Sequence, residues 1–213
     1  MAHSDTVTRI LDSAETLFAE RGFAETSLRS ITAQAEVNLA AVNYHFGSKK
    51  SLIQAVFARF LAPFYRMVES SLDAHEARHP DVILSVEEIL RFVARSISQV
   101  SEGDRRRLAI FMRLLGLAYN QGQAHLRKFL QVEYRAVSSR MMALITKATP
   151  ELKDEERFWR IHFMLGAAAF TLSNMEHLRA IFEHDFDTQC TEEDVIAMLM
   201  PFLGAAVRAK SAL

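Results

Sequence analysis

One short segment near the N-terminus contains the side chains whose types and spacing could do chemistry. Asn43, Tyr44 and His45 form a polar run, and Lys49 and Lys50 follow it. An amide offers both a donor and an acceptor, while phenol, imidazole and ammonium groups can donate hydrogen bonds to phosphate oxygens. The two lysines stand where a helix is expected to begin, and a helix N-terminus itself favours anions. This combination is typical of a surface that binds duplex DNA.

The same segment predicts two short helices joined by a tight turn. Thr26 or Ser27 can cap the first helix, and Asn38 can cap the second, which is expected to run to about Phe46. The apolar positions that can close a miniature core are Leu28, Ile31, Ala35, Val37, Val42 and Phe46. A helix, a turn and a helix therefore position the polar run.

The outward face of the second predicted helix is unusual for a surface helix. It presents Leu39, Ala40 and Ala41 beside the polar run, whereas exposed helix faces usually carry Glu and Lys. Small side chains let a helix approach base edges closely, and Ala can contact a thymine methyl group. This face is interpreted as a docking surface.

The elements around this segment are also predicted to be helical. Apolar residues from Val7 to Phe18 have helical spacing, and Gly22 can end that helix. A long helix begins near Lys49, Pro63 is expected to kink it, and a polar loop is expected over 73–85. Further helices are predicted at 86–101, 104–118, 123–148, 154–179 and 192–209. The prediction is an all-α chain with a helix-turn-helix domain at 1–48 and a larger helical domain at 49–213.

Composition supports this class and excludes others. The chain has 213 residues, of which half are hydrophobic, with only seven Gly, four Pro and one Cys. The scarcity of turn residues favours helices, and a lone Cys190 fits a reducing compartment. No signal-peptide pattern is present, and the longest nearly apolar stretch, 163–172, is about half the length of a membrane helix. We expect a soluble cytoplasmic protein that does not enter membranes.

Catalysis is poorly supported by the sequence. The eight His residues are scattered, and the chain has no HExxH or CxxC motif and no Gly-rich phosphate loop. We therefore expect neither an enzyme nor a bound metal or cofactor. The formal net charge is −1, so a DNA-binding face must come from local placement of basic groups.

At these residues the sequence resembles the TetR family of bacterial regulators. The family's signature is similar to the run Val42-Asn-Tyr-His-Phe-Gly-Ser-Lys49, and its first-helix signature to 14–23 followed by 26–31. The matching region spans about residues 7–55. Likeness to fatty-acid-responsive members extends through 38–50, 110–118 and 158–170. The resemblance implies a homodimeric regulator, which a long-chain fatty acid or acyl-CoA would release from a palindromic operator.

The resemblance also implies which residues contact DNA. Those expected to face the groove or the phosphates are Thr26, Ser27, Arg29, Leu39, Ala40, Ala41, Asn43, Tyr44, His45, Lys49 and Lys50. The sequence departs from the family at Glu36, which stands where the turn usually has Gly. A non-Gly residue in the left-handed conformation costs about 1 kcal/mol, which a packed three-helix unit tolerates.

Two apolar segments of the larger domain have alternative interpretations. An aromatic and Met-rich stripe could bind an apolar effector, through Phe111, Met112, Leu115, Tyr119, Phe129 and His162, or could be simple core. The last two long helices could form a dimer interface, through Phe158, His162, Leu165, Ala169, Val195, Met198, Leu199 and Phe202, or could pack within one subunit. A drug-like or aromatic effector, and a helical lipid carrier without DNA binding, remain as alternative functions.

Overall fold

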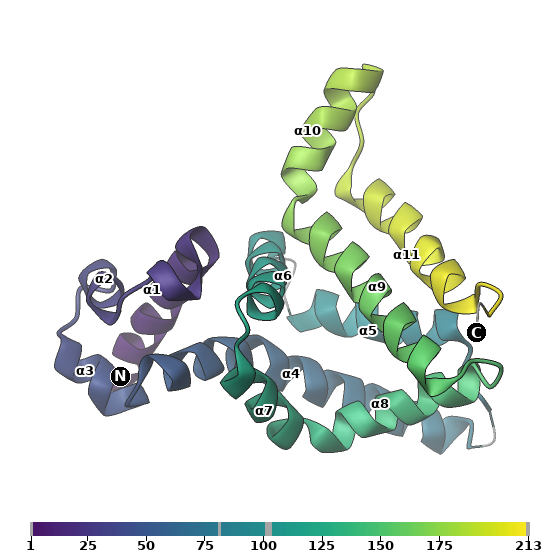
Figure 1. The fold of residues 1–213 in the computed structure, drawn as a ribbon, viewed down its shortest axis with the longest axis horizontal. Helices are drawn as coiled ribbons and strands as arrows, with labels where there is room; N and C mark the ends of the chain where they lie inside the picture. The colour runs from purple at the N-terminus through teal and green to yellow at the C-terminus, as the bar shows by residue number, and fades with distance from the viewer. Residues whose placement is uncertain (1, 81, 101–103, 212–213) are drawn as a thin grey trace. The chain divides into compact units, whose positions relative to one another are not determined.

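The computed structural model describes residues 2–80, 82–100 and 104–211, and over these residues the chain forms helices and no strands (Figure 1). The all-α prediction is confirmed. The helices are α1 (Ala2–Glu25), α2 (Leu28–Gln34), α3 (Leu39–Phe46), α4 (Lys49–Arg78), α5 (Val86–Val100), α6 (Arg105–Asn120), α7 (Ala124–Glu133), α8 (Arg135–Ala148), α9 (Asp154–Ser173), α10 (Met175–Phe186) and α11 (Glu192–Arg208).

The chain divides into two compact units, and the helices α4 and α6 each contribute to both. Unit 1 comprises Met1–Pro63 and Ile110–Tyr134, and unit 2 comprises Phe64–Ala109 and Arg135–Leu213. This division differs from the expected boundary at residue 48. The first half of α4 and the segment around α7 belong with the N-terminal helices, because aromatic packing continues past residue 48.

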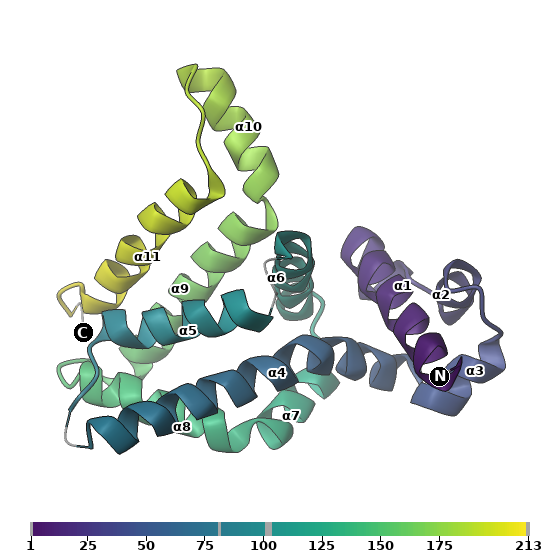
Figure 2. The ribbon, with the colours of Figure 1, turned by 180° about the vertical axis from the view of Figure 1, so that it is seen from behind.

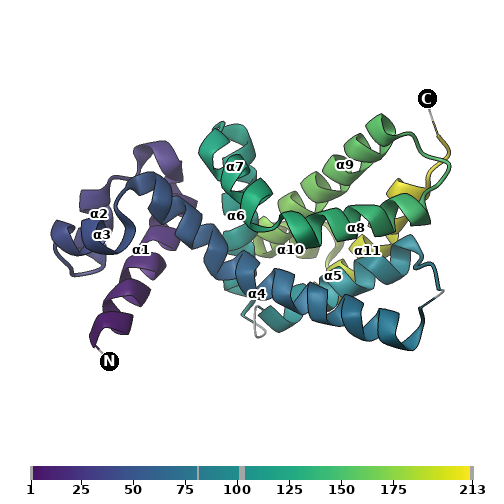
Figure 3. The same cartoon turned by 90° about the horizontal axis from the view of Figure 1, so that it is seen from below.

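The core of unit 1 is a series of phenylalanine rings. The ring centroids of Phe18 and Phe23 are 5.3 Å apart, and those of Phe23 and Phe57 are 6.3 Å apart. Phe60 then stacks on Phe111 of α6 with a centroid distance of 4.0 Å and an interplanar angle of 12°. Figure 3 shows α1, α2 and α3 grouped at the beginning of α4. The rings therefore join α1 to α4 and α6.

An ion-pair cluster fixes α4 against α1 beside this core. The Arg59 guanidinium lies 2.5 Å from a carboxylate oxygen of Asp12 and 3.2 Å from one of Glu15. Burial opposes the charge on Arg59, but the hydrogen bond to Asp12 and the two carboxylate charges outweigh it and raise the pKa of the guanidinium. The ion pairs thus fix the rotation of α4 about its own axis relative to α1.

Unit 2 contains two apolar clusters. The first joins α4, α5 and α8 around Val68, Leu72 and Val137. The second joins α5 to α9 and α11 around Leu90, Leu203 and Val207. Figure 2 shows α9 and α11 running alongside each other, with α10 at the far end of the pair. The pair packs on α5 through the second cluster.

The base of this pair is held by buried charge. The Arg160 guanidinium donates to the carbonyl oxygens of Val207 (2.6 Å), Ala209 (2.5 Å) and Lys210 (3.0 Å), and it also donates to Glu156 (2.6 Å). Both charged side chains are less than a tenth exposed. Because the last carbonyls of a helix lack partners within the helix, Arg160 acts as a cap for the end of α11.

Three sequence predictions about the helices were wrong. The expected loop at 73–85 begins later, because α4 continues to Arg78. In the last turns of α4, Asp73 and Glu76 form ion pairs with Arg140 of α8 at 2.6 Å and 2.8 Å. The helix expected at 123–148 breaks at Tyr134, and the one expected at 154–179 breaks at Asn174. At the second break, the Asn174 amide donates to the carbonyl of Phe170 (2.8 Å), which satisfies a group at the helix end.

Candidate nucleic-acid interface

The helix α3 is fixed by a cap at each end and by one buried side chain. The side-chain oxygen of Asn38 accepts a hydrogen bond from the Ala41 N–H at 2.8 Å, as the sequence predicts. At the other end, Gly47 has φ 72°, and its N–H donates to the carbonyl of Asn43 at 3.0 Å. Val42 is fully buried. These contacts leave the remaining face of α3 directed outward.

The outward face carries the residues expected to contact DNA. Ala40 and Asn43 are exposed, Leu39 is 38% exposed and Tyr44 is 78% exposed. Ala41 is half-buried. The face therefore presents small, amide and phenol groups, which can approach base edges and phosphates.

The helix α2 is held by reciprocal hydrogen bonds at its first turn. Ser27 caps it: the Ser30 N–H donates to the Ser27 hydroxyl oxygen at 3.0 Å, and the Ser27 N–H donates to the Ser30 hydroxyl oxygen at 3.1 Å. Arg29 is exposed on the same turn. Both residues lie at the surface, as a contact with DNA requires.

Thr26 does not lie at the surface, and its predicted role in DNA contact is wrong. The residue is fully buried, and its hydroxyl donates to the carbonyls of Gly22 (2.8 Å) and Leu17 (3.0 Å). Its short hydroxyl satisfies two carbonyls at the end of α1 instead. The sequence could not distinguish Thr26 from Ser27, because both types cap helices.

The turn between α2 and α3 has the strained geometry that the sequence predicts. Glu36 has φ 52°, the left-handed conformation that favours glycine. The adjacent Val37 N–H donates to the carbonyl of Thr32 at 3.0 Å, which closes the turn. The backbone at Glu36 is therefore strained, and the hydrogen bond of Val37 holds it in that conformation.

Basic and aromatic groups lie at the end of α3 and the beginning of α4. The Lys49 ammonium donates to the carbonyl of Ala24 at 3.3 Å and is half-buried, whereas Lys50 is exposed. His45 is half-buried, with its ring centroid 5.1 Å from that of Tyr44. Burial, followed by the positive charge of Lys50, lowers the pKa of His125 on α7. Local placement thus supplies positive charge that the overall composition lacks.

Family models match both the N-terminal and the C-terminal parts of the chain. The family described as "Bacterial regulatory proteins, tetR family" matches residues 10–56, which contain α2 and α3. The family described as "Tetracyclin repressor-like, C-terminal domain" matches residues 91–206, more than half of the chain. The chain belongs to the TetR family. Members of the TetR family are transcription regulators and not enzymes.

Curated relatives match mainly at the N-terminus. An HTH-type transcriptional repressor of Mycobacterium tuberculosis is 43% identical over 65 residues, which is 30% of this chain and 35% of that protein. The HTH-type transcriptional repressor KstR2 of Rhodococcus jostii is 30% identical over 105 residues, which is 41% of this chain and 52% of that protein. The chain thus spans between a third and about half of the length of these relatives.

Solved structures share the fold over nearly the whole chain. A TetR-like transcriptional regulator from Rhodococcus has a TM-score of 0.57 and 20% identity, with 95% of this chain and 93% of that chain covered. A mutant of HlyIIR has a TM-score of 0.54 and 16% identity, with 98% and 100% covered. The identity is low, so these likenesses concern the fold alone.

The residues suggested for an effector site are divided between the two units. Five of them lie in unit 1: Phe111, Met112, Leu115, Tyr119 and Phe129. Phe111 and Met112 are buried, Phe111 in the ring stack with Phe60, while Tyr119 is 60% exposed. His162 lies in unit 2. Five of the six residues therefore belong to one unit and His162 to the other.

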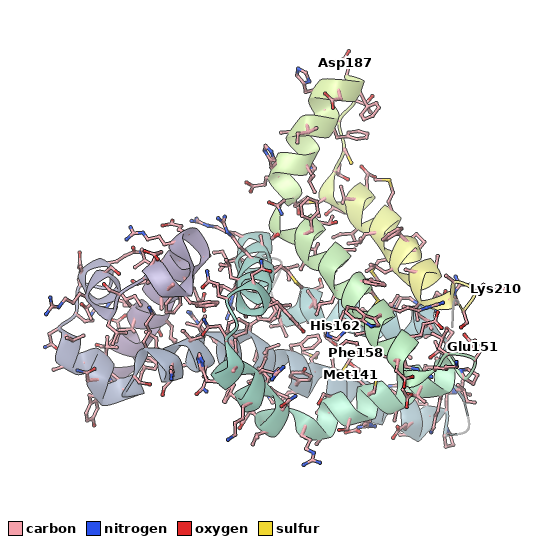
Figure 4. All side chains as sticks on the ribbon, in the orientation of Figure 1. Met141, Glu151, Phe158, His162, Asp187 and Lys210 are labelled. Carbon is pink, nitrogen blue, oxygen red and sulfur yellow. The ribbon has the colours of Figure 1, made fainter. Side chains whose placement is uncertain are left out.

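His162 has an aromatic neighbour on its own helix. Its ring centroid is 4.0 Å from that of Phe158, and its Nδ1 atom lies 2.7 Å from the Phe158 carbonyl oxygen. Figure 4 labels both residues, and both come from α9. The imidazole is thus held by α9 itself, with its orientation fixed by the preceding turn.

The residues suggested for a dimer interface are unevenly exposed. Phe158, Met198 and Phe202 are 53%, 58% and 60% exposed. His162, Leu165, Ala169 and Val195 are half-buried. Leu199 packs in the core cluster of α5, α9 and α11. That interface set therefore contains both surface residues and residues that pack inside unit 2.

The aromatic residues that α9 exposes most lie within the segment expected to form the interface, but they are not among the eight interface residues predicted from the sequence. Trp159, Phe163 and Phe170 are 56%, 64% and 62% exposed, and the rings of the first two stack with centroids 5.9 Å apart. Their spacing places them on one face of the helix, about 100° around from the stripe with Phe158. A helix that is apolar on nearly all sides gives no signal for choosing between these faces.

Other kinds of site find no support in the described part of the chain. Over the ranges 2–80, 82–100 and 104–211, no group of three or more His, Cys, Asp or Glu is arranged to hold a metal ion. Asp81, which belongs to the polar loop expected at 73–85, lies outside the described residues. None of the described helices is both long enough and apolar enough to cross a membrane.

Proposed function

We propose that this protein is a cytoplasmic, homodimeric transcription repressor that binds a palindromic operator by placing α3 in the major groove of duplex DNA. Membership of the TetR family supports this function, as do the relatives named as repressors. The observation that carries the proposal is the outward face of α3, where Ala40, Asn43 and Tyr44 are exposed while Val42 anchors the helix. The small side chains let the helix approach base edges closely, and the amide and phenol groups can form hydrogen bonds with bases and phosphates.

The proposed contacts divide into two classes. Arg29, Leu39, Ala40, Ala41 and Asn43 would face the bases, whereas Ser27, Tyr44, His45, Lys49 and Lys50 would contact phosphates. Base contacts determine which sequence is bound, and phosphate contacts determine register and affinity. Thr26 is left out, because it is fully buried.

Dimerisation is required because a single head, the three helices α1–α3, carries few positive charges for binding DNA. One copy of α3 and its flanking lysines provides few phosphate contacts, so its affinity would be low. Two copies in adjacent major grooves double the contacts and make a palindromic site the natural target. We assign the interface to the exposed aromatic stripe of α9 together with Met198 and Phe202 of α11.

DNA binding is tested by selecting an operator from random duplexes and measuring affinity over a range of salt concentrations. Lys50→Ala should weaken binding to all duplexes and reduce the slope of log affinity against log salt by about 1 per subunit, because one phosphate contact is lost. Lys147→Ala, which removes an exposed lysine of α8, is the matched control and should leave the slope unchanged.

Asn43→Ala separates base recognition from phosphate binding. It should cost about 1–3 kcal/mol on the selected operator and much less on a random duplex, because only base recognition is lost. If the wild-type protein retards no duplex at low ionic strength, the proposed function is wrong, and a helical lipid carrier becomes the better reading.

The proposed effector is a long-chain fatty acid or its CoA ester. The likeness of 110–118 and 158–170 to fatty-acid-responsive members supports this class, and His162 offers a hydrogen-bonding group beside aromatic rings. An effector relieves repression when it favours a conformer of the dimer that does not fit DNA. Palmitate and palmitoyl-CoA should therefore weaken operator binding.

A titration with palmitate, palmitoyl-CoA and an aromatic cation such as ethidium distinguishes the effector classes. Ethidium also binds duplex DNA, so its effect is measured as binding to the protein alone. Release by the acyl compounds supports the proposal. Protein binding by the cation, with no response to either acyl compound, would assign a drug-like effector and reject the fatty acid.

A further inference from the structure

The end of α1 contains a backbone break that a distant side chain satisfies. Gly22 has φ 82° and ψ 169°, which are not helical angles, although the helix resumes for one turn. The following Phe23 N–H donates to the side-chain oxygen of Gln121 at 3.0 Å, across 98 positions of sequence. Gln121 directly follows the last residue of α6. One amide group therefore joins the end of α6 to the end of α1 within unit 1.

The fit between Gln121 and Gly22 is close. A Cβ atom at position 22 would lie 2.6 Å from the Gln121 side-chain nitrogen, so any other residue there would displace the Gln121 amide. The positive φ of Gly22 is a conformation that favours glycine, so a substitution would also strain the backbone. The Gln121 amide thus rests directly on the backbone at the break while accepting a hydrogen bond from the next residue.

The segment that Gln121 holds leads into the DNA-binding helices. The carbonyl of Gly22 accepts a hydrogen bond from the buried Thr26 hydroxyl, and Ser27 then caps α2. The Phe23 ring packs between Phe18 and Phe57. A displacement at Phe23 would therefore pass through buried contacts to the beginning of α2, and from there to α3.

Contacts of α4 with α6 and α7 do not depend on Gln121. The Gln54 side-chain amide donates to the carbonyl of His125 at 3.3 Å, and Phe60 stacks on Phe111. These contacts join α4 to α6 and α7, and they would persist if the Gln121 side chain were shortened. Removing the amide should loosen the end of α1 without unfolding unit 1.

We propose that Gln121 is a positioning residue for DNA binding, which sets the orientation of α2 and α3 by holding the Gly22–Phe23 break of α1. This proposal rests on the proposed function, because it assumes that α3 binds DNA. Gln121 itself need not contact DNA. The held backbone reduces the ordering that the head must undergo on an operator, so the hydrogen bond contributes to affinity through preorganisation.

The test compares Gln121→Ala with Gln123→Ala, because the Gln123 side chain lies in the same turn and donates a hydrogen bond to the Gln121 carbonyl at 3.4 Å. In Gln121→Ala, amide hydrogen exchange at Phe23 should accelerate about fivefold or more, the change expected for one lost hydrogen bond. Operator affinity should fall by a similar factor. In Gln123→Ala, both quantities should stay within twofold of the wild type.

Two further readouts separate positioning from other roles. The salt slope of Gln121→Ala should equal that of the wild type, because no phosphate contact is lost. Gln121→Glu keeps an acceptor for the Phe23 N–H, so it should retain slow exchange at Phe23. A reduced salt slope in the alanine variant would show direct DNA contact and overturn the proposal.

The outcomes also distinguish this proposal from the proposed function. If the wild type binds no duplex, the DNA-binding function fails, whatever the exchange rate at Phe23. If the wild type binds its operator and Gln121→Ala binds equally well despite rapid exchange at Phe23, the positioning role is wrong and the function stands. Unchanged exchange at Phe23 would show that the hydrogen bond contributes nothing.

Discussion

The head (α1–α3) and the C-terminal hairpin (α9–α11) are both held by polar contacts, but of different kinds. In the head, neutral hydroxyl and amide groups cap the helices, as Ser27 and Asn38 do. In the hairpin, the buried charges of Glu156 and Arg160 hold the end of α11. A neutral cap contributes modestly wherever it stands, whereas a buried charge stabilises the fold only while its partners remain.

The two regions also differ in the surfaces that they leave exposed. The head presents Ala40, Asn43 and Tyr44 on α3, and the hairpin presents Trp159 and Phe163 on α9. The first surface suits a polar, highly charged partner and the second suits an apolar one. Salt should therefore weaken association through the head and leave association through the hairpin largely unchanged.

The largest effect is expected from breaking the buried charge network of the hairpin. Arg160→Met should lower the free energy of unfolding by about 3–5 kcal/mol, because Glu156 and three carbonyls lose a buried partner. Denaturant titration measures this change. The double variant Glu156→Met/Arg160→Met should recover much of the loss, and Arg135→Met, at an exposed position of α8, is the control. A single variant as stable as the wild type would refute this account.

The next effect concerns the aromatic face of the hairpin. Phe163→Glu should weaken dimerisation about 100-fold, because a charge would be buried against the partner's apolar stripe. Sedimentation velocity over a concentration series measures the dissociation constant. Val132→Glu changes an equally exposed apolar residue, 71% exposed on α7, and should leave the dimer intact. A Phe163→Glu protein that remains dimeric at low concentration would place the interface elsewhere.

The head was largely predictable because its two short helices, α2 and α3, each need a local signal. Asn38 and Ser27 cap α3 and α2 as the sequence predicts, and Gly22 breaks α1. Glu36 adopts the left-handed conformation expected of the turn. In a helix of seven or eight residues, one cap satisfies a large fraction of the unpaired backbone groups, so the residue type and the geometry correspond closely.

The larger domain was less predictable because its decisive contacts are distant in sequence. The breaks at Tyr134 and Asn174 carry neither Gly nor Pro, so the pattern predicted continuous helices. The exposed face of α9 depends on how α5 and α11 pack against its other side. Gln121 was missed for the same reason, since its partner lies 98 positions away.

Strain at two turns allows a direct comparison of the regions. Glu36 in the head and Asp187 in the hairpin both have positive φ, at 52° and 48°. Glu36→Gly should raise the free energy of unfolding by about 1 kcal/mol, because glycine adopts this conformation without strain. Asp187→Gly should gain less, because Asp tolerates the left-handed region better than Glu does. Thermal melting of both variants shows which substitution stabilises the fold more. A lower melting temperature for Glu36→Gly than for the wild type would contradict the assignment of strain.

The smallest effect is a pH dependence located in unit 1. Burial and the charge of Lys50 lower the pKa of His125 below 6.5, and its Nε2 atom is buried with no hydrogen-bond partner among the described residues. The unfolded chain therefore takes up a proton at a higher pH than the folded chain does, and stability should be lost as the pH falls from about 6.5 towards the lowered pKa. His125→Gln should show a smaller drop in melting temperature between about pH 8 and pH 5.5 than the wild type, while His177→Gln, at an exposed position of α10, should not differ from it. Because Lys50 contributes to the shift, Lys50→Ala should also reduce the drop. An equal drop in all four proteins would show that the pH response of the fold arises outside this contact.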